Sequence, residues 1–149
     1  MIVQAPLSGV VHELKDAPDP VFAAGMVGPG AYLEPEMGRQ TAVSPISGKA
    51  VRVMPHAFVV LGDGVGVLVH LGVNTVRLKG EGFEVLAKQG DKVEAGTPMV
   101  TWDPSTISKD DDMDPAVLIV AMDQPADAVK LGEPGRTVAA GDTLMEVGA

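Results

Sequence analysis

Hydrophobic and polar residues alternate most regularly along the stretch Val65–Val73. Its odd-numbered positions are all apolar, whereas its even-numbered positions are mixed: Gly66, Leu68, His70 and Gly72. On a β-strand these two sets of side chains point to opposite faces. We therefore expect a strand whose odd positions face the core and whose more accessible face carries His70. Gly66 and Gly72, on either side, would leave space over the imidazole.

Shorter apolar-rich runs predict further strands along the chain. These runs are Gly9–Leu14, Lys49–Met54, Ala57–Leu61, Glu84–Ala87, Met99–Trp102, Ala116–Ala121 and Thr143–Val147. Helical signals are weak, and we expect only short helical turns at Ala17–Phe22, Ser105–Asp112 and Gln124–Leu131. Because no linker-like composition divides the chain, we predict one all-β domain over residues 1–149, an antiparallel β-sandwich or open barrel.

Two internal sequence repeats indicate that this β-architecture is duplicated. The segment Ala5–Gly9 recurs as Ser44–Gly48, and each copy is followed by an apolar-rich run. The segment Lys88–Asp103 aligns at a constant offset with Glu133–Gly148, and both share the spacing G-x-x-V-x-x-G. Reuse of the same turn residues would by itself explain either repeat alone. Two such repeats in one chain favour an internal duplication.

Composition narrows the classes of function. The chain has 149 residues, 46% of them hydrophobic, with 18 Gly and 12 Pro, which favours short strands joined by turns. A formal net charge of −9 argues against nucleic acid as a partner. The absence of cysteine excludes disulfides and thiol catalysis. The sequence shows neither a signal peptide nor an apolar run long enough to span a bilayer, so we expect a cytoplasmic protein.

Three histidines are the main candidates for chemistry. We expect His12 to be a solvated surface residue, since it lies where a strand runs into charged residues. His56 follows Pro55 and, taken alone, is more readily interpreted as structural. However, His56 and His70 lie on two successive strands joined by the turn signal Leu61–Gly64, so a hairpin would let them face each other.

A close histidine pair supports three kinds of chemistry. A catalytic zinc site needs a third protein ligand, and neither H-x-H nor H-E-x-x-H is present. General acid–base catalysis needs a further oriented group. In the third kind, one neutral imidazole attacks phosphorus while the other hydrogen-bonds the phosphoryl oxygens, which suits a side chain with a pKa of roughly 6.5.

The residues around this pair resemble the glucose-type enzyme IIA domain of the bacterial sugar phosphotransferase system. The resemblance covers nearly the whole chain, and the combination of H-x-G-x-x-T-V with L-x-G-E-G-F is highly specific. The matching stretches are Ala5–Gly9, Pro18–Ala23, Met26–Gly30, His56–Phe58, Val69–Val76, Leu78–Phe83, Gly90–Gly96 and Gly141–Val147.

The resemblance implies a β-sandwich with a shallow site and assigns roles to the two histidines. His70 would accept a phosphoryl group on its Nε2 atom, and His56 would support the transfer. The donor would be the phosphohistidine carrier HPr, and the acceptor would be a cysteine of a sugar-specific enzyme IIB (EIIB) domain of the permease. No cofactor, metal or direct membrane insertion is implied, although His56 and His70 could bind zinc adventitiously.

The resemblance also implies an apolar partner-binding surface made of Phe22, Met26, Val27 and Leu71. Asn74, Thr75 and Val76 would support the acceptor. Two positions depart from the common pattern, because relatives often carry Asp at Asn74 and Thr at Met54. The sugar is not specified by this chain, and Met1 with the complete motif set favours a free-standing protein.

Three other functions stay open at this point. A metal-dependent hydrolase on a duplicated β-fold would bind zinc stoichiometrically. A lipoyl- or biotinyl-type carrier is suggested by the turn G-D-K-V-x-x-G, but it needs a modifiable Lys at a hairpin tip, in a context such as M-K-M or D-K-A, that the chain lacks. A regulatory role, in which the phosphorylation state controls other binding partners, is compatible with the phosphocarrier reading.

Overall fold

Three antiparallel sheets make up the fold of residues 1–107 and 112–148, the part of the chain that the computed structural model describes. The largest sheet has eight strands in the order β13-β2-β3-β11-β7-β6-β5-β9. Its strands are β2 (Gly9–Glu13), β3 (Gly30–Pro35), β5 (Gly48–Met54), β6 (Ala57–Gly62), β7 (Val65–Val73), β9 (Lys92–Val93), β11 (Asp114–Ala121) and β13 (Thr137–Val138). The smaller sheets have the orders β1-β14-β12 and β4-β10-β8. Their strands are β1 (Ile2–Gln4), β4 (Gln40–Val43), β8 (Glu84–Val85), β10 (Pro98–Trp102), β12 (Val129–Leu131) and β14 (Thr143–Val147).

The main core lies between the large sheet and the two small ones, because inward-facing apolar side chains from all three sheets form a single cluster. Val69 and Ile119 enter it from the large sheet, Leu144 from β14, and Val100 and Trp102 from β10. All five are at most 1% exposed. The alternation of apolar and polar positions along the strands produces this arrangement, and the predicted antiparallel all-β class is confirmed.

The internal duplication extends to individual hydrogen bonds. Adding 39 to a residue number in the first half of the chain, or subtracting 45 near its end, gives the equivalent position in the other copy. The bond from the Gly141 amide to the Ala5 carbonyl thus matches the bond from Gly96 to Ser44, and both are 2.9 Å long. The segments around Pro6 and Pro45 also exchange equivalent backbone hydrogen bonds. The Gln4 amide donates to the Pro45 carbonyl at 2.9 Å, and the Val43 amide donates to the Pro6 carbonyl at 2.8 Å. The repeats therefore form two interlocked copies of one structural unit.

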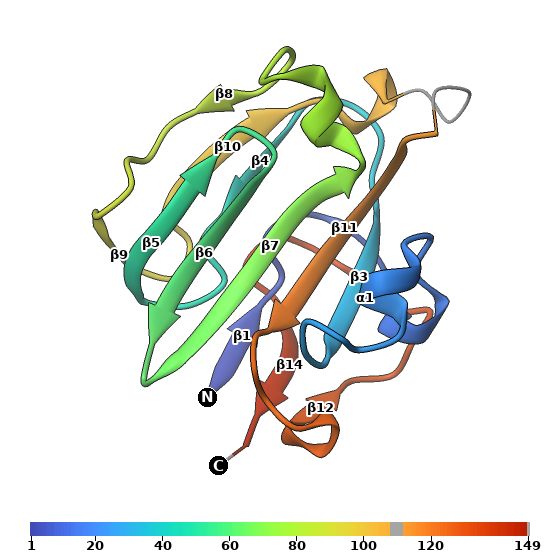
Figure 1. Cartoon of the computed structure of the whole chain (residues 1–149), viewed down its shortest axis with the longest axis vertical. Helices are drawn as coiled ribbons and strands as arrows, with labels where there is room; N and C mark the ends of the chain where they lie inside the picture. The colour runs from blue at the N-terminus through green and yellow to red at the C-terminus, as the bar shows by residue number, and fades with distance from the viewer. Residues whose placement is uncertain (108–111, 149) are drawn as a thin grey trace.

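The copies differ most in one connection. In the second copy, β5 and β6 are joined by the two residues Pro55 and His56, since Met54 pairs with Ala57. In the first copy, β2 and β3 are joined by residues 14–29, which contain η1 (Leu14–Asp16) and α1 (Pro20–Ala23). Figure 1 shows α1 beside β3 and β11. This long connection covers a second, smaller apolar cluster on the outer face of the large sheet, where Phe22 packs with Leu118 and Val120.

The predicted strands are present, although their ends shift. The predicted run Glu84–Ala87 is paired only over Glu84–Val85. The sequence pattern missed β1, β3, β4 and the two-residue strands β9 and β13. It also wrongly assigned Gln124–Leu131 to a helix, because only Ala126–Ala128 is helical and the following residues pair with β14 as β12.

The helical segments are all short. They are α1 (Pro20–Ala23) and the 3₁₀ turns η1 (Leu14–Asp16), η2 (Thr75–Leu78), η3 (Pro104–Thr106) and η5 (Ala126–Ala128). Within the predicted helical segment Ser105–Asp112, residues 108–111 lie outside the described residues. In the described part of the chain, no helix is long and apolar enough to cross a membrane.

Strand β7 follows the predicted alternation up to its last residues. Val67, Val69 and Leu71 are fully buried in the main core, as expected. Val73 is also buried, but it belongs to the outer cluster, so its predicted side of the sheet is wrong. The reason is Gly72, whose φ of +86° reverses the alternation opposite a register shift in β11.

We expect Gly30→Ala to destabilise the fold because β3 passes too close to β11 for a side chain at this position. A Cβ atom at Gly30 would overlap the backbone carbonyl of Ile119. The loss in the free energy of unfolding should be about 3 kcal/mol, measured by urea denaturation. Gly25→Ala is the control, because Gly25 has a positive φ but open space around it, and it should cost about 1 kcal/mol. Equal losses for the two variants would contradict the close-packing argument.

Candidate functional site

The β6–β7 hairpin brings His56 and His70 together. Its turn consists of Asp63 and Gly64, both with positive φ (51° and 79°), as a tight type I′ connection requires. The register that follows pairs Ala57 with His70. His56 immediately precedes Ala57, in the connection before β6, and its ring contacts that of His70. The hairpin predicted from the turn signal is confirmed.

The two imidazoles are in contact at the surface of the sheet. Their ring centroids are 5.1 Å apart and their planes are inclined by 72°, an edge-to-face arrangement. The backbone also links them, because the Leu71 amide donates a hydrogen bond of 2.7 Å to the carbonyl of His56. Both side chains are partly buried. The site is therefore a shallow pair of rings, with His70 on strand β7 and His56 in the two-residue connection between β5 and β6.

One hydrogen bond determines which nitrogen of His70 carries the proton. Its Nδ1 atom lies 2.6 Å from the carbonyl oxygen of Gly72. A carbonyl only accepts hydrogen bonds, so Nδ1 must be the donor. The neutral ring then keeps its lone pair on Nε2. Sequence analysis considered Gly72 only as a small neighbour, so it missed this carbonyl, which becomes available because the backbone turns at a φ of +86°.

Both histidines favour the neutral form. Burial lowers the pKa of His70 below the usual 6.5, while the Gly72 carbonyl and the negative charge of Asp19 act in the opposite direction. Burial also lowers the pKa of His56, and repulsion by a charged His70 lowers it further. At neutral pH the pair therefore consists of two neutral imidazoles, one of which presents a lone pair on Nε2.

Asp19 is a residue of the site that the sequence analysis quoted only as part of a motif. Its side chain accepts hydrogen bonds from the amides of Val21 (2.9 Å) and Phe22 (3.3 Å), and it thereby caps α1. An Asp followed by Pro20 is a recognisable helix start, so the cap was detectable in the sequence. The cap places the Phe22 ring 5.7 Å from the His70 ring, measured between centroids.

Of the apolar residues expected around the pair, Phe22 contacts His70, and the four differ in exposure. Met26 is 77% exposed, whereas Phe22 and Val27 are partly buried in the outer cluster. The expected surface position of Leu71 is wrong, because its side chain is fully buried in the main core and cannot form part of a surface. Leu71 lies before the reversal at Gly72, in the part of β7 where the side chains of odd-numbered residues still point into the main core. Val21, 49% exposed, was not among the expected residues.

The three residues expected to support the acceptor have different environments. Asn74 adopts a left-handed conformation (φ 62°) and donates a hydrogen bond of 2.8 Å from Nδ2 to the carbonyl of Asp112. Thr75 is fully buried, and its hydroxyl donates to the Leu71 carbonyl at 2.6 Å. Val76 is 57% exposed on η2. Asn74 and Thr75 therefore belong to the turn that follows β7, and Val76 lies on its surface.

His12 lies away from the pair, two strands beyond β11. It stacks on Tyr32 with 4.7 Å between ring centroids, and its Nε2 atom is 3.8 Å from a carboxylate oxygen of Glu34. Its side chain is 33% exposed. The expectation of a surface position is thus met only in part, because the ring is stacked on one side.

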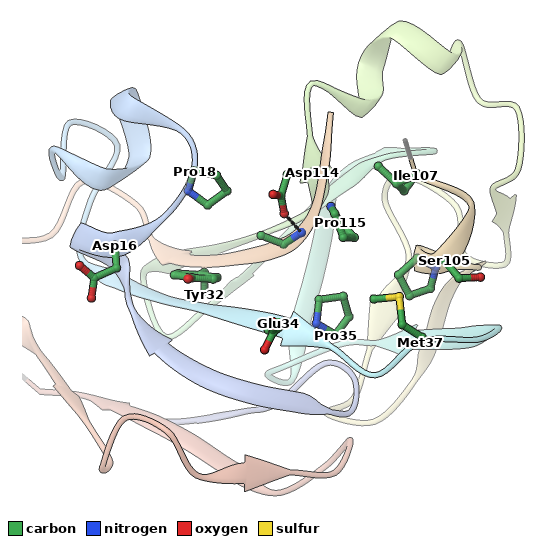
Figure 2. A pocket seen from close by; sticks show the side chains of 12 residues that line it. Asp16, Pro18, Tyr32, Glu34, Pro35, Met37, Ser105, Ile107, Asp114 and Pro115 are labelled. Atoms are coloured by element: carbon green, nitrogen blue, oxygen red, sulfur yellow. Dashed lines mark hydrogen bonds between the residues drawn. The ribbon is translucent and has the colours of Figure 1, made fainter. Parts of the chain in front are cut away.

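A separate cleft of about 390 Å³ lies on the outer face of β3 and β11 (Figure 2). Asp16 and Pro18 border it from the long connection, Tyr32 and Glu34 from β3, and Asp114 from β11. The negative charges of Asp16, Glu34 and Asp114 raise the pKa of Tyr32, in addition to the effect of its burial. Neither His56 nor His70 lines this cleft. The histidine pair is thus separate from this cleft.

The described residues contain no group of three or more His, Cys, Asp or Glu side chains arranged to hold a metal ion. The histidine pair offers two nitrogen ligands, fewer than zinc sites in proteins use.

Fold and site together define a β-sandwich protein with a surface pair of neutral histidines. Residues 1–126 match the family model described as phosphoenolpyruvate-dependent sugar phosphotransferase system, EIIA 1. The chain therefore belongs to this family of phosphotransferase-system components.

Individual relatives agree with this assignment. The glucose-specific EIIA component of Staphylococcus aureus is 46% identical over 103 residues, which are 67% of this chain and 61% of that protein. The corresponding component of Staphylococcus epidermidis is 43% identical over 104 residues, covering 68% of this chain and 61% of the relative. The matched region thus spans about three fifths of the length of these relatives.

A solved structure is similar over almost the full chain. Glucose permease IIA from Mycoplasma capricolum superposes with a TM-score of 0.86 at 31% sequence identity, covering 97% of this chain and 94% of that chain. The sandwich with short helical turns is therefore the fold of the family.

We expect the lowered pKa values of the pair to make the fold less stable in acid. Below about pH 6.5 the unfolded chain takes up protons at these histidines more readily than the folded protein does, so the free energy of unfolding falls. Above that pH both states are neutral there and the contribution is constant. Urea unfolding of the wild type and of His70→Gln from about pH 5 to about pH 8 checks this. The variant should show the weaker pH dependence, and identical slopes would contradict the shift.

Proposed function

We propose that this chain is a phosphocarrier, which accepts a phosphoryl group from phospho-HPr on His70 and passes it to a cysteine of a sugar-specific EIIB domain in the cytoplasm. The observation that carries the proposal is the bond from His70 Nδ1 to the Gly72 carbonyl, because it leaves the Nε2 lone pair free at neutral pH. Family membership supports the same assignment. We propose residues 1–149 as the single domain that performs it.

In the first step, the Nε2 lone pair of His70 attacks the phosphorus atom of the donor phosphohistidine. A bond forms between Nε2 and phosphorus as the bond between phosphorus and the donor nitrogen breaks, and the electron pair of that bond returns to the donor imidazole. Nδ1 of His70 keeps its proton throughout. The Gly72 carbonyl supports the positive charge that develops on the His70 ring as it is phosphorylated, since it accepts the hydrogen bond from that ring.

In the second step, a cysteine thiolate of the acceptor domain attacks the same phosphorus atom. The bond between phosphorus and sulfur forms, the bond to Nε2 breaks, and His70 returns to the neutral state with Nδ1 protonated. Residues 1–149 contain no cysteine, so the onward acceptor lies outside them. The reaction needs positioning and charge stabilisation more than covalent chemistry from the protein.

His56 is the second member of the site. With its ring 5.1 Å from that of His70, measured between centroids, it is close enough to donate a hydrogen bond to a phosphoryl oxygen on Nε2. Its lowered pKa keeps it neutral before the phosphoryl group arrives. The negative charge of the bound phosphoryl group then favours a donor at this position. His56 thus supports transfer without forming a covalent bond.

Exposed apolar side chains beside the pair form the proposed docking surface for both partners. Val21 and Met26 lie on one side of the site, in and after α1, and Val76 lies on η2 after the acceptor strand. Phe22 contacts His70 directly and connects this surface to the acceptor. When a partner covers the surface, water is excluded from the reacting atoms and electrostatic interactions there become stronger.

We expect His70→Gln and His56→Gln to separate the two roles. His70→Gln should abolish acid-labile phosphorylation in a mixture of phosphoenolpyruvate, enzyme I and HPr, because the acceptor nitrogen is lost. His56→Gln should still be labelled by HPr but should pass the group on to an EIIB domain about a hundredfold more slowly. Labelling is measured with radioactive phosphate and intact mass. His12→Gln is the matched control, and undiminished labelling of His70→Gln would refute the assignment.

The docking surface can be tested with charges at its exposed apolar positions. Met26→Glu should raise the KM for phospho-HPr about tenfold with little change in stability, since burying a carboxylate against an apolar partner is unfavourable. Ile2→Glu is the control, because Ile2 is 49% exposed on β1, in one of the small sheets. An equal effect of both substitutions would place the docking surface elsewhere.

A further inference from the structure

The turn that follows β7 is held by a hydroxyl with no access to solvent. Thr75 is 0% exposed, and its Oγ1 atom donates a hydrogen bond of 2.6 Å to the carbonyl of Leu71. This bond spans four residues and closes the chain into a loop around Gly72, Val73 and Asn74. Breaking this bond would leave a buried hydroxyl without a partner, which is unfavourable. The bond therefore holds the Leu71 carbonyl in place.

The Leu71–Gly72 peptide is the unit that this bond holds. At Leu71, the amide is anchored to the His56 carbonyl at 2.7 Å and the carbonyl to Thr75 at 2.6 Å. With both groups fixed, the orientation of the peptide plane that leads into Gly72 is determined. The next carbonyl along the chain is that of Gly72, which accepts the hydrogen bond from His70 Nδ1.

The methyl group of Thr75 packs against the same glycine. A Cβ atom placed on Gly72 would lie 2.5 Å from Thr75 Cγ2 and 3.0 Å from the carbonyl oxygen of Asp114. Little space therefore remains beside the Gly72 Cα for the peptide to swing. The hydroxyl of Thr75 thus holds the Leu71–Gly72 peptide, and its methyl packs beside the Gly72 Cα, from which the next carbonyl follows.

We propose that Thr75 is a positioning residue for His70: its buried hydroxyl holds the Leu71–Gly72 peptide so that the Gly72 carbonyl selects the Nδ1-protonated tautomer and frees Nε2. The importance of that tautomer for phosphoryl transfer rests on the proposed function, but the tautomer itself is a property of this chain alone. Thr75 does not touch the reacting atoms, and it acts only through the backbone.

A merely structural role for Thr75 leads to a different expectation. If the hydroxyl only stabilised the turn, its removal would lower the free energy of unfolding and leave the folded His70 ring unchanged. A positioning role requires the ratio of the two neutral tautomers to change in the folded protein. The tautomer ratio is therefore the measurement that separates the two roles.

The experiment uses the full chain labelled with ¹⁵N, and two-bond ¹H–¹⁵N correlation spectra of its imidazoles above the pKa of His70. The wild type should show His70 protonated on Nδ1. Thr75→Ser keeps the hydroxyl, Thr75→Ala removes it with the same loss of the methyl, and Thr75→Val removes it while keeping the shape. We expect the ratio of the Nδ1-protonated to the Nε2-protonated form to fall about tenfold in Thr75→Ala and Thr75→Val, and by less than about twofold in Thr75→Ser.

Thr41→Val is the matched control. It breaks another hydroxyl bond, the one of 2.9 Å between Thr41 and Thr101 on β4 and β10, and it should leave the His70 spectrum unchanged. Amide spectra report whether each variant is folded, and if Thr75→Val does not fold, the comparison of Ser with Ala decides. A wild type protonated on Nε2, or a wild-type tautomer ratio in folded Thr75→Ala, would overturn the proposal.

Phosphorylation assays on the same variants keep the two proposals apart. If the tautomer shifts in the variants but HPr does not label His70 of the wild type either, Thr75 positions the ring and the proposed phosphocarrier role fails. If HPr labels His70 at the wild-type rate while the tautomer ratio is unchanged, the phosphocarrier role stands and the positioning role fails.

Discussion

The hydrogen bond from His70 Nδ1 to the Gly72 carbonyl is the interaction on which the site depends. For that carbonyl to face a side chain two residues earlier on the same strand, the strand has to leave its regular path. The positive φ of Gly72 and the register shift in β11 provide the departure. Burial lowers the pKa of both imidazoles, and repulsion by a charged His70 lowers that of His56 further, so both favour the neutral form. A backbone irregularity thus gives an ordinary histidine a defined nucleophilic nitrogen.

The site lies where the two structural copies differ. Equivalent hydrogen bonds relate the copies around the repeated segments at Ala5 and Ser44, but the short connection at His56 and the long connection over residues 14–29 have no common form. The short connection supplies one histidine, and the long one supplies Asp19 and Phe22. The duplicated framework provides the stable sandwich and the acceptor strand β7, and its asymmetric connections place His56, Asp19 and Phe22 beside the acceptor.

Much of the fold could be predicted from the sequence, because strands such as β7 and β11 carry long apolar runs between clear turns. The hairpin and the histidine pair followed from the Asp63–Gly64 turn. Strands β1, β3 and β4 were missed since they are short or interrupted by polar residues, and their partners are distant in sequence. The inward position of Leu71 and the role of the Gly72 carbonyl depend on a backbone reversal, which side-chain patterns do not report.

The connection between β2 and β3 also separates two tasks along the chain. The acceptor and its hydrogen-bond partners belong to β7 and the turn after it, whereas Val21, Phe22 and Met26 belong to a segment of 16 residues placed between two strands. Replacing that segment would alter which surfaces this face can recognise while the strands beneath it keep their register. As long as Asp19 and Phe22 stay beside His70, the identity of a partner can therefore change in evolution without altering the reactivity of the histidine, and a transplanted connection that keeps these two residues could be used to redirect docking.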